Sequence, residues 1–133
     1  LVCGVGSGGT ISGTGKYLKS KIADIKVIAV EPESSPVLTK GVSGAHKIQG
    51  IGANFVPENL DRDIYDTVLT VSDDDAFNYA RLICKTEGLS VGISAGAALS
   101  AAVSLAKESD AEGKNIVVIF PDTASRYLST ELF

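Results

Sequence analysis

Short apolar runs alternate with amphipathic stretches along the chain. Four apolar runs have the length of buried strands, at 1–5, 26–31, 67–71 and 115–120. Helical patterns follow at 11–21, 72–87 and 94–107, and a helix of one or two turns is expected near 34–38. This order predicts an α/β fold with a mostly parallel sheet and flanking helices. Because the run 115–120 is apolar throughout, we expect a central strand covered on both faces.

The stretch from about residue 41 to 63 shows neither the apolar run of a buried strand nor the periodic pattern of a helix. Loops of this length in compact domains are commonly functional or disordered. The apolar residues Ile48, Ile51 and Phe55 favour an ordered loop. After the next strand, Ser72 is followed by three aspartates, whose charges suit the positive end of a helix dipole. We interpret these aspartates as helix capping rather than as a metal site.

Composition narrows the class of protein. The chain has 133 residues, enough for one domain with a core, and no apolar run long enough to span a membrane. A net charge of −4 without a lysine or arginine cluster argues against nucleic-acid and anionic-membrane partners. Cys3 and Cys84 form neither a C-x-x-C motif nor a disulfide framework, so we expect a cytoplasmic protein. Without methionine and with an apolar start, the chain is expected to be a fragment of a longer protein.

A glycine-rich segment separates the first strand from the first helix: Gly6, Ser7, Gly8, Gly9 and Thr10. Without Cβ atoms the backbone can take positive φ angles and approach a ligand closely. N–H groups at a helix start and the hydroxyls of Ser7 and Thr10 can donate to phosphate oxygens. We interpret the segment as an anion site. It holds no lysine, so it does not match the P-loop of nucleoside triphosphatases.

Two chemistries compete for this segment. Gly4, Gly6 and Gly9 also fit G-x-G-x-x-G, and Glu31 ends the next strand, about where a dinucleotide fold places its ribose-binding acid. The chain could therefore be a Rossmann-like dinucleotide-binding module. Gly8 is a glycine that this pattern does not require, and Thr10 sits where a phosphate could use its hydroxyl. The residues alone leave both readings open.

Five segments together carry a resemblance to a known family. They are Gly6–Gly13, Val30–Pro32, His46–Ala53, Val91–Ala97 and Arg126–Thr130. In this order they resemble pyridoxal-phosphate enzymes of the tryptophan synthase β-subunit fold type, and among them the cysteine synthases, or O-acetylserine sulfhydrylases. The resemblance spans nearly the whole chain. It implies that residues 1–133 are the C-terminal part of a two-domain catalytic unit of fold type II.

The resemblance also implies a role for particular residues. Gly6, Ser7, Gly8, Gly9 and Thr10 would hold the phosphate of pyridoxal 5'-phosphate, and Gly50, Ile51 and Gly52 would line the substrate side. Ser94 would hydrogen-bond the pyridine nitrogen. Because a hydroxyl carries no charge to keep that nitrogen protonated, the ring becomes a weaker electron sink, which favours β-elimination and replacement over transamination. The other reading of Ser94 is a cap for the helix that begins at Ala95.

The chain lacks the family's central catalytic group. The lysine that forms the Schiff base lies in the N-terminal part of these enzymes, and no lysine here sits in such a motif. We therefore expect no catalytic residue in this chain and no activity from it alone. Since the family assigns proton transfer to that lysine, we expect His46, the single histidine, to order its loop.

The function implied by the resemblance is that of a cysteine synthase. Such an enzyme makes L-cysteine and acetate from O-acetyl-L-serine and sulfide, forms a homodimer, and can bind the C-terminal tail of serine acetyltransferase. The nearest enzymatic alternative is the catalytic core of a cystathionine β-synthase. Threonine dehydratases fit less well, because they tend to carry a longer glycine run. A homologue that acts only as a binding partner is a further alternative.

Overall fold

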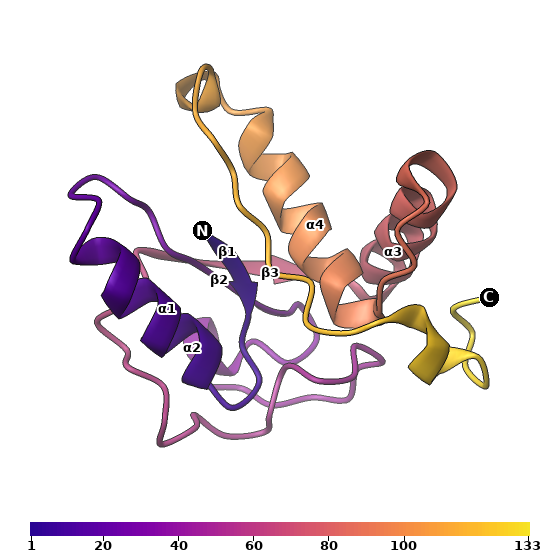
Figure 1. The fold of residues 1–133 in the computed structure, drawn as a ribbon. Coiled ribbons are helices and arrows are strands. Elements are labelled where there is room, and N and C mark those ends of the chain that lie inside the picture. The colour runs from indigo at the N-terminus through magenta and orange to yellow at the C-terminus, as the bar shows by residue number, and fades with distance from the viewer.

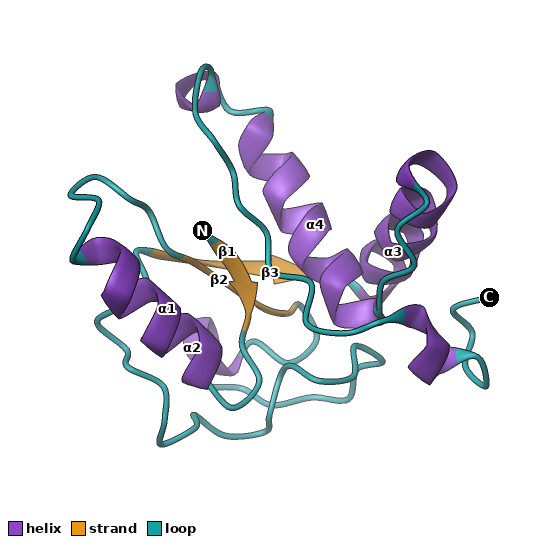
Figure 2. Cartoon of the chain, in the orientation of Figure 1, coloured by secondary structure: helices purple, strands orange, loops and turns teal.

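The chain folds into a parallel sheet with helices on both faces, as its apolar pattern predicts. The computed structural model describes residues 1–133. Its elements are β1 (Val2–Gly4), α1 (Gly9–Lys19), β2 (Ile28–Pro32), α2 (Val37–Lys40), β3 (Thr67–Val71), α3 (Asp73–Glu87), α4 (Ile93–Ala106), and the 3-10 turns η1 (Ser109–Ala111) and η2 (Ala124–Tyr127). The connection between α2 and β3 is drawn as loop throughout in Figure 2. No helix combines the length and apolar character needed to cross a membrane.

The sheet has the order β1-β2-β3, and both pairs of strands are parallel. Beyond β1, the segment 117–119 continues the sheet through a parallel bridge between Val2 and Val118. The Val2 N–H donates to the Val117 carbonyl (2.8 Å), and the Ile119 N–H donates to the Val2 carbonyl (3.0 Å). The prediction of a central strand at 115–120 was wrong. Only β1 flanks this segment, and Val117 is 57% exposed.

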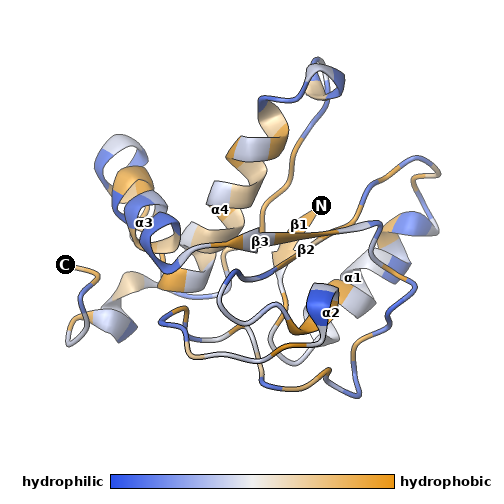
Figure 3. Ribbon diagram, turned by 180° about the vertical axis from the view of Figure 1, so that it is seen from behind, coloured by the Kyte–Doolittle hydropathy of each residue, from blue (hydrophilic) through white to orange (hydrophobic).

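Side chains on the strands alternate between two apolar clusters, because successive residues of a strand point to opposite faces. Val2, Ile28 and Val30 join the cluster beneath α3 and α4, whereas Cys3 and Ala29 join the cluster beneath α1. Figure 1 shows α1 and α2 on one side of the sheet and α3 and α4 on the other. In Figure 3 the strands carry mostly apolar colours, and α3 mixes apolar and polar turns.

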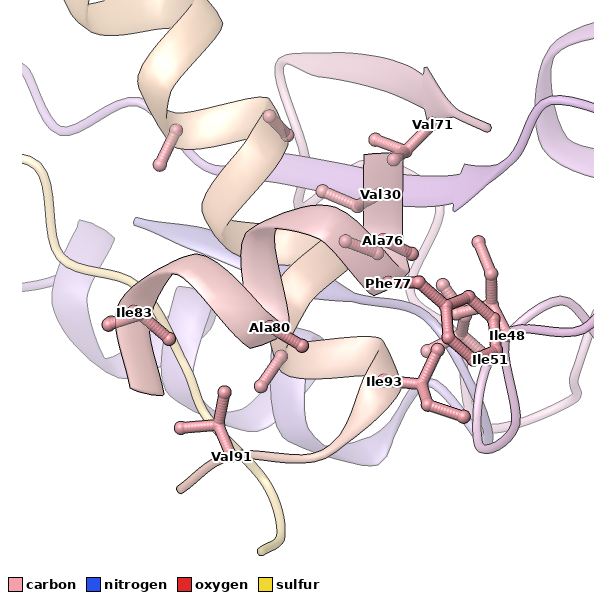
Figure 4. Close-up of a cluster of buried hydrophobic side chains, with 14 of the residues drawn as sticks. Val30, Ile48, Ile51, Val71, Ala76, Phe77, Ala80, Ile83, Val91 and Ile93 are labelled. Carbon is pink, nitrogen blue, oxygen red and sulfur yellow. The ribbon is translucent and has the colours of Figure 1, made fainter. Parts of the chain in front are cut away.

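Helices α3 and α4 pack closely because glycine and alanine line their contact. A Cβ atom on Gly96 would lie 2.0 Å from the carbonyl oxygen of Ala76. Figure 4 shows the cluster around them, with Phe77 of α3 drawn beside Ile48 and Ile51 of the long loop. Ile48 and Ile51 therefore anchor the loop in the core as expected, whereas Phe55 is 66% exposed and takes no part in this anchoring.

The start of α3 confirms the capping interpretation. The Ser72 hydroxyl accepts a hydrogen bond from the Asp75 N–H (3.1 Å), and three aspartates occupy the first turn. Gly88 ends the helix with φ of 71°, in the left-handed region. The two cysteines are free.

Candidate functional site

A cleft of about 140 Å³ opens at the carboxyl ends of β1 and of the segment 117–119. Ligands of open parallel sheets commonly bind at this edge. Twelve residues line it: Cys3, Gly4, Gly6, Ser7, Gly8, Thr10, Ile11, Gly50, Ile51, Ser94, Ile119 and Pro121. The structure thus brings together three segments that the sequence singled out separately. Gly9 and Gly52 belong to those segments and are absent from the lining.

The glycine-rich segment offers unused hydrogen-bond donors. The N–H groups of Ser7, Gly8, Thr10 and Ile11 donate to no other group of the chain, and that of Gly9 makes only a long contact with the Ser7 hydroxyl (3.5 Å). Helix α1 begins here, and its first turn carries no acidic residue. The positive end of the helix dipole therefore faces the cleft with no carboxylate to neutralise it. Such a donor set suits an anion with several oxygens, such as a phosphate.

Two of the glycines are required by neighbouring protein segments. Gly8 has φ of 83°, and a Cβ atom there would lie 2.7 Å from the Leu60 Cα. On Gly6, a Cβ atom would lie 2.3 Å from the Gly50 carbonyl oxygen. Gly9 differs, since its nearest neighbour would be the Ser7 hydroxyl at 3.7 Å. The long loop thus packs against the glycine-rich segment, which explains Gly6 and Gly8 without a ligand.

Ser94 is the second residue of α4 and is only 3% exposed. Its hydroxyl makes no hydrogen bond within the chain, although it lies on the lining of the cleft. The cap position belongs to Gly92, and no side chain caps this helix. The alternative that Ser94 caps the helix was therefore wrong. An almost buried hydroxyl without a partner in the chain is instead free to bind a ligand in the cleft.

The Gly50–Gly52 segment closes over the glycine-rich segment and is held in place by His46. Both glycines have positive φ angles, 93° and 69°. The Gly52 N–H donates to the Val5 carbonyl (3.0 Å), which ties the segment to the end of β1. His46 Nε2 contacts the Gly52 carbonyl (2.9 Å), and Nδ1 accepts from the Ile48 N–H (3.2 Å). In this arrangement the neutral Nε2–H tautomer fits both bonds, so His46 orders the loop as expected.

Glu31 does not face the cleft and cannot read a ribose. Its carboxylate is 2% exposed and accepts three hydrogen bonds. The donors are the Leu38 N–H (2.7 Å), the Thr39 N–H (3.1 Å) and the Thr39 hydroxyl (2.6 Å). Both oxygens are therefore used to cap the short helix α2. The dinucleotide reading of Glu31 was wrong.

Three further residues, which no sequence motif marked as site residues, also line the cleft: Cys3, Ile119 and Pro121. Burial raises the pKa of the Cys3 thiol to about 11, so the thiol stays protonated, and it donates weakly to the Gly4 carbonyl (3.4 Å). Ile119 and Pro121 sit at the carboxyl end of an apolar run. The carboxyl ends of parallel strands lie at one edge of a sheet, where ligands commonly bind. This rule was the sequence signal that could have placed Ile119 and Pro121 on the cleft.

The residues of the cleft fit a flat phosphate ester that carries a ring nitrogen. Backbone donors at one segment suit the phosphate, and the Ser94 hydroxyl suits a ring nitrogen. The apolar residues Ile119 and Pro121 on the lining are not buried and supply surfaces for an aromatic ring. No lysine, arginine or carboxylate side chain lines the cleft, so the backbone N–H groups and hydroxyls provide the recognition.

Comparison with known proteins agrees with this chemistry. The family model described as "Pyridoxal-phosphate dependent enzyme" matches residues 1–122. A cysteine synthase of Buchnera aphidicola subsp. Schizaphis graminum is 52% identical over 141 aligned positions, which cover 100% of this chain and 44% of the relative. The chain thus spans less than half the length of this curated relative.

Solved structures share the fold closely. A cysteine synthase of Entamoeba histolytica has a TM-score of 0.97 at 43% identity, covering 99% of this chain and 39% of the other. An O-acetylserine dependent cystathionine beta-synthase of Helicobacter pylori has a TM-score of 0.88 at 47% identity, covering 99% of this chain and 42% of the other.

Proposed function

Because the chain belongs to the family of pyridoxal-phosphate dependent enzymes, we propose that it is the C-terminal part of the catalytic domain of a cysteine synthase. The reaction is a β-replacement on O-acetyl-L-serine. The bond from the β-carbon to the acetate oxygen breaks, a bond from that carbon to sulfide forms, and L-cysteine and acetate are released. The observation that carries the proposal is the convergence of unused backbone donors and the free Ser94 hydroxyl on one cleft.

The residues present fit pyridoxal phosphate and divide its binding between them. The segment from Gly6 to Thr10 would hold the phosphate with backbone N–H groups and the hydroxyls of Ser7 and Thr10. Ser94 would face the ring nitrogen with a hydroxyl, which carries no charge to hold that nitrogen protonated. When bound, the cofactor supplies a conjugated ring that stabilises negative charge on the substrate's α-carbon.

The Gly50–Gly52 segment would form the substrate side of the site. Gly50 and Ile51 line the cleft, and Ile48 and Ile51 belong to the core cluster that anchors the segment. The bonds to Val5 and His46 fix its shape before any ligand arrives. A segment fixed in this way orients a bound amino acid and excludes water at little entropic cost.

The size of the chain supports its assignment to part of a larger catalytic unit. It covers 44% of the Buchnera relative's length. Two apolar side chains in the C-terminal part of the chain, Val117 and Leu128, are 57% and 72% exposed. We propose that the remaining part of the enzyme covers them and provides the Schiff-base lysine.

The proposal extends to partners and location. The enzyme is expected to be a cytoplasmic homodimer that can bind the C-terminal tail of serine acetyltransferase. A net charge of −4 without a basic cluster argues against nucleic acid as a partner. Size-exclusion chromatography with light scattering on the full-length protein, alone and with a tail peptide, tests these assemblies.

The experiment uses the full-length protein supplied with pyridoxal phosphate and O-acetyl-L-serine. The second substrate is sulfide in one arm and homocysteine in the other, and products are identified by mass spectrometry. Cysteine from the sulfide arm is the expected product. Cystathionine alone would favour the alternative named by the Helicobacter pylori neighbour. Absence of both products would refute the proposal.

Two serine variants link the activity to the site. Ser94→Ala removes the hydroxyl from the cleft and is expected to lower kcat about tenfold, the value of one hydrogen bond at a buried site. Ser104→Ala on the same helix is the matched control, since that hydroxyl bonds only the Ser100 carbonyl (3.2 Å). Equal activity of both variants would contradict the role of Ser94.

A further inference from the structure

The turn that precedes α4 is held by a segment thirty residues further along the chain. The Gly92 N–H donates to the Asp122 carbonyl (3.1 Å), and the Ala124 N–H donates to the Ser90 carbonyl (3.2 Å). Between them, Val91 and Thr123 form an antiparallel bridge. The position of the first turn of α4, and with it Ser94, therefore depends on the segment that ends in η2.

Two side chains of that segment occupy the space beside Gly92. A Cβ atom on Gly92 would lie 2.0 Å from Asp122 Oδ1 and 2.7 Å from Tyr127 Cε2. The Tyr127 hydroxyl donates a hydrogen bond to Asp122 Oδ2. Burial, this hydrogen bond and the carboxylate charge raise the pKa of Tyr127 to about 12, so the hydroxyl keeps its proton. The side chains of Asp122 and Tyr127 together fill the space that a capping side chain at position 92 would occupy.

The carboxylate also lies at the positive end of α4. Asp122 Oδ1 is buried and has no hydrogen-bond partner. The N–H groups of Ile93, Ser94 and Ala95 likewise donate to no other group, and the first turn of α4 carries no acid of its own. A negative charge next to three unpaired donors is stabilised by the helix dipole. This interaction explains how a carboxylate oxygen without a partner can be buried at this place.

We propose that Asp122 and Tyr127 are positioning residues for Ser94. Asp122 fixes the Gly92 turn through its backbone carbonyl and its carboxylate, and Tyr127 fixes the carboxylate. The pair thereby sets the point from which the Ser94 hydroxyl reaches the ring nitrogen. This inference rests on the proposed role of Ser94, and it adds two residues that do not line the cleft.

A double-mutant cycle on the full-length protein tests the coupling. The apoprotein is titrated with pyridoxal phosphate, and the Kd is measured from the cofactor's absorption and fluorescence. Ser94→Ala and Asp122→Ala are each expected to weaken binding about tenfold. If Asp122 acts through Ser94, the double variant should have about the same Kd for pyridoxal phosphate as the single variant that binds it less tightly. Both single variants should also shift the absorption maximum of the bound cofactor in the same direction.

A conservative variant and a charge control separate positioning from a general loss of stability. Asp122→Asn keeps an oxygen that can accept from Tyr127 but removes the charge at the start of α4, so it should recover part of the lost affinity. Asp24→Ala removes an exposed aspartate that makes no hydrogen bond and should leave the Kd unchanged. The melting temperature of each apoprotein is measured alongside. If Asp122→Ala does not fold, the same cycle is run with Tyr127→Phe, which keeps the ring.

The outcomes distinguish this inference from the proposed function. A double variant weakened about a hundredfold would show that Asp122 and Ser94 act independently, and the positioning role would be wrong. Failure of Asp122→Asn to recover affinity would also count against it. If Ser94→Ala itself leaves the Kd unchanged, the assignment of Ser94 is wrong and the inference falls with it.

Discussion

Adding one methyl group to Gly6 should displace the segment that closes the cleft. In Gly6→Ala the new Cβ atom would lie 2.3 Å from the Gly50 carbonyl oxygen, and separations below 3.0 Å do not persist in proteins. The backbone of Gly6 does not have a positive φ angle, so alanine is not strained by its own conformation. The whole effect must therefore come from the contact with Gly50.

The magnitude follows from what holds Gly50 in place. The Gly50 carbonyl cannot turn aside alone, because Gly52, two residues later, is hydrogen-bonded to Val5 and His46. Overpacking of a tight contact costs about 1–3 kcal/mol, and loss of the bond to Val5 costs about 1 kcal/mol more. We expect a destabilisation of about 3 kcal/mol, a melting temperature lower by roughly 6 °C, and cofactor binding at least about tenfold weaker.

The assay compares full-length Gly6→Ala with Gly13→Ala by thermal unfolding and by titration of each apoprotein with pyridoxal phosphate. Gly13 is the matched control, because it lies exposed in α1 and a Cβ atom there meets nothing within 4 Å. Alanine at this position should stabilise the helix by about 0.5–1 kcal/mol. A Gly6→Ala protein as stable and as tight-binding as the wild type would refute the contact between the two segments.

Three further predictions concern stability. Gly96→Ala should cost about 3 kcal/mol or prevent folding, because its Cβ would meet the Ala76 carbonyl at 2.0 Å; denaturation measures this, and wild-type stability would contradict it. Partial burial favours the neutral form of Asp66, but the hydrogen bond from the Val27 N–H and the lysine paired with Asp66 hold the pKa of Asp66 below the usual 3.8. Asp66→Asn should therefore lose about 1 kcal/mol near pH 7 and approach the wild type as the pH falls below 4, whereas a gap independent of pH would argue against the charge. Glu31→Gln should cost about 2 kcal/mol in thermal unfolding, since an amide cannot accept all three bonds to α2, and an unchanged melting temperature would contradict that cap.

Local patterns were sufficient to predict most of the fold. The strand at 67–71 and the cap at Ser72 follow from neighbouring residues, and both were found where the sequence placed them. The run 115–120 was misplaced, because an apolar run indicates covered faces without saying which part of the protein covers them. In this chain only β1 lies beside it.

The segments that form the site could be predicted from the sequence, but the contacts that require particular residues in them could not. Glycines at 6 and 8 indicated an anion site, yet their nearest neighbours are Gly50 and Leu60. Those contacts join residues more than forty positions apart, and no local pattern encodes them. Glu31 fitted a dinucleotide pattern by its spacing alone, and the nearby helix α2 uses its carboxylate instead.

A crystal structure of the full-length protein with bound pyridoxal phosphate tests the central claim most directly. The account predicts that the phosphate oxygens accept hydrogen bonds from the N–H groups of Ser7, Gly8 and Thr10, and that the ring nitrogen lies within hydrogen-bond distance of the Ser94 hydroxyl. A phosphate bound away from the glycine-rich segment, or a ring nitrogen facing another side chain, would contradict it.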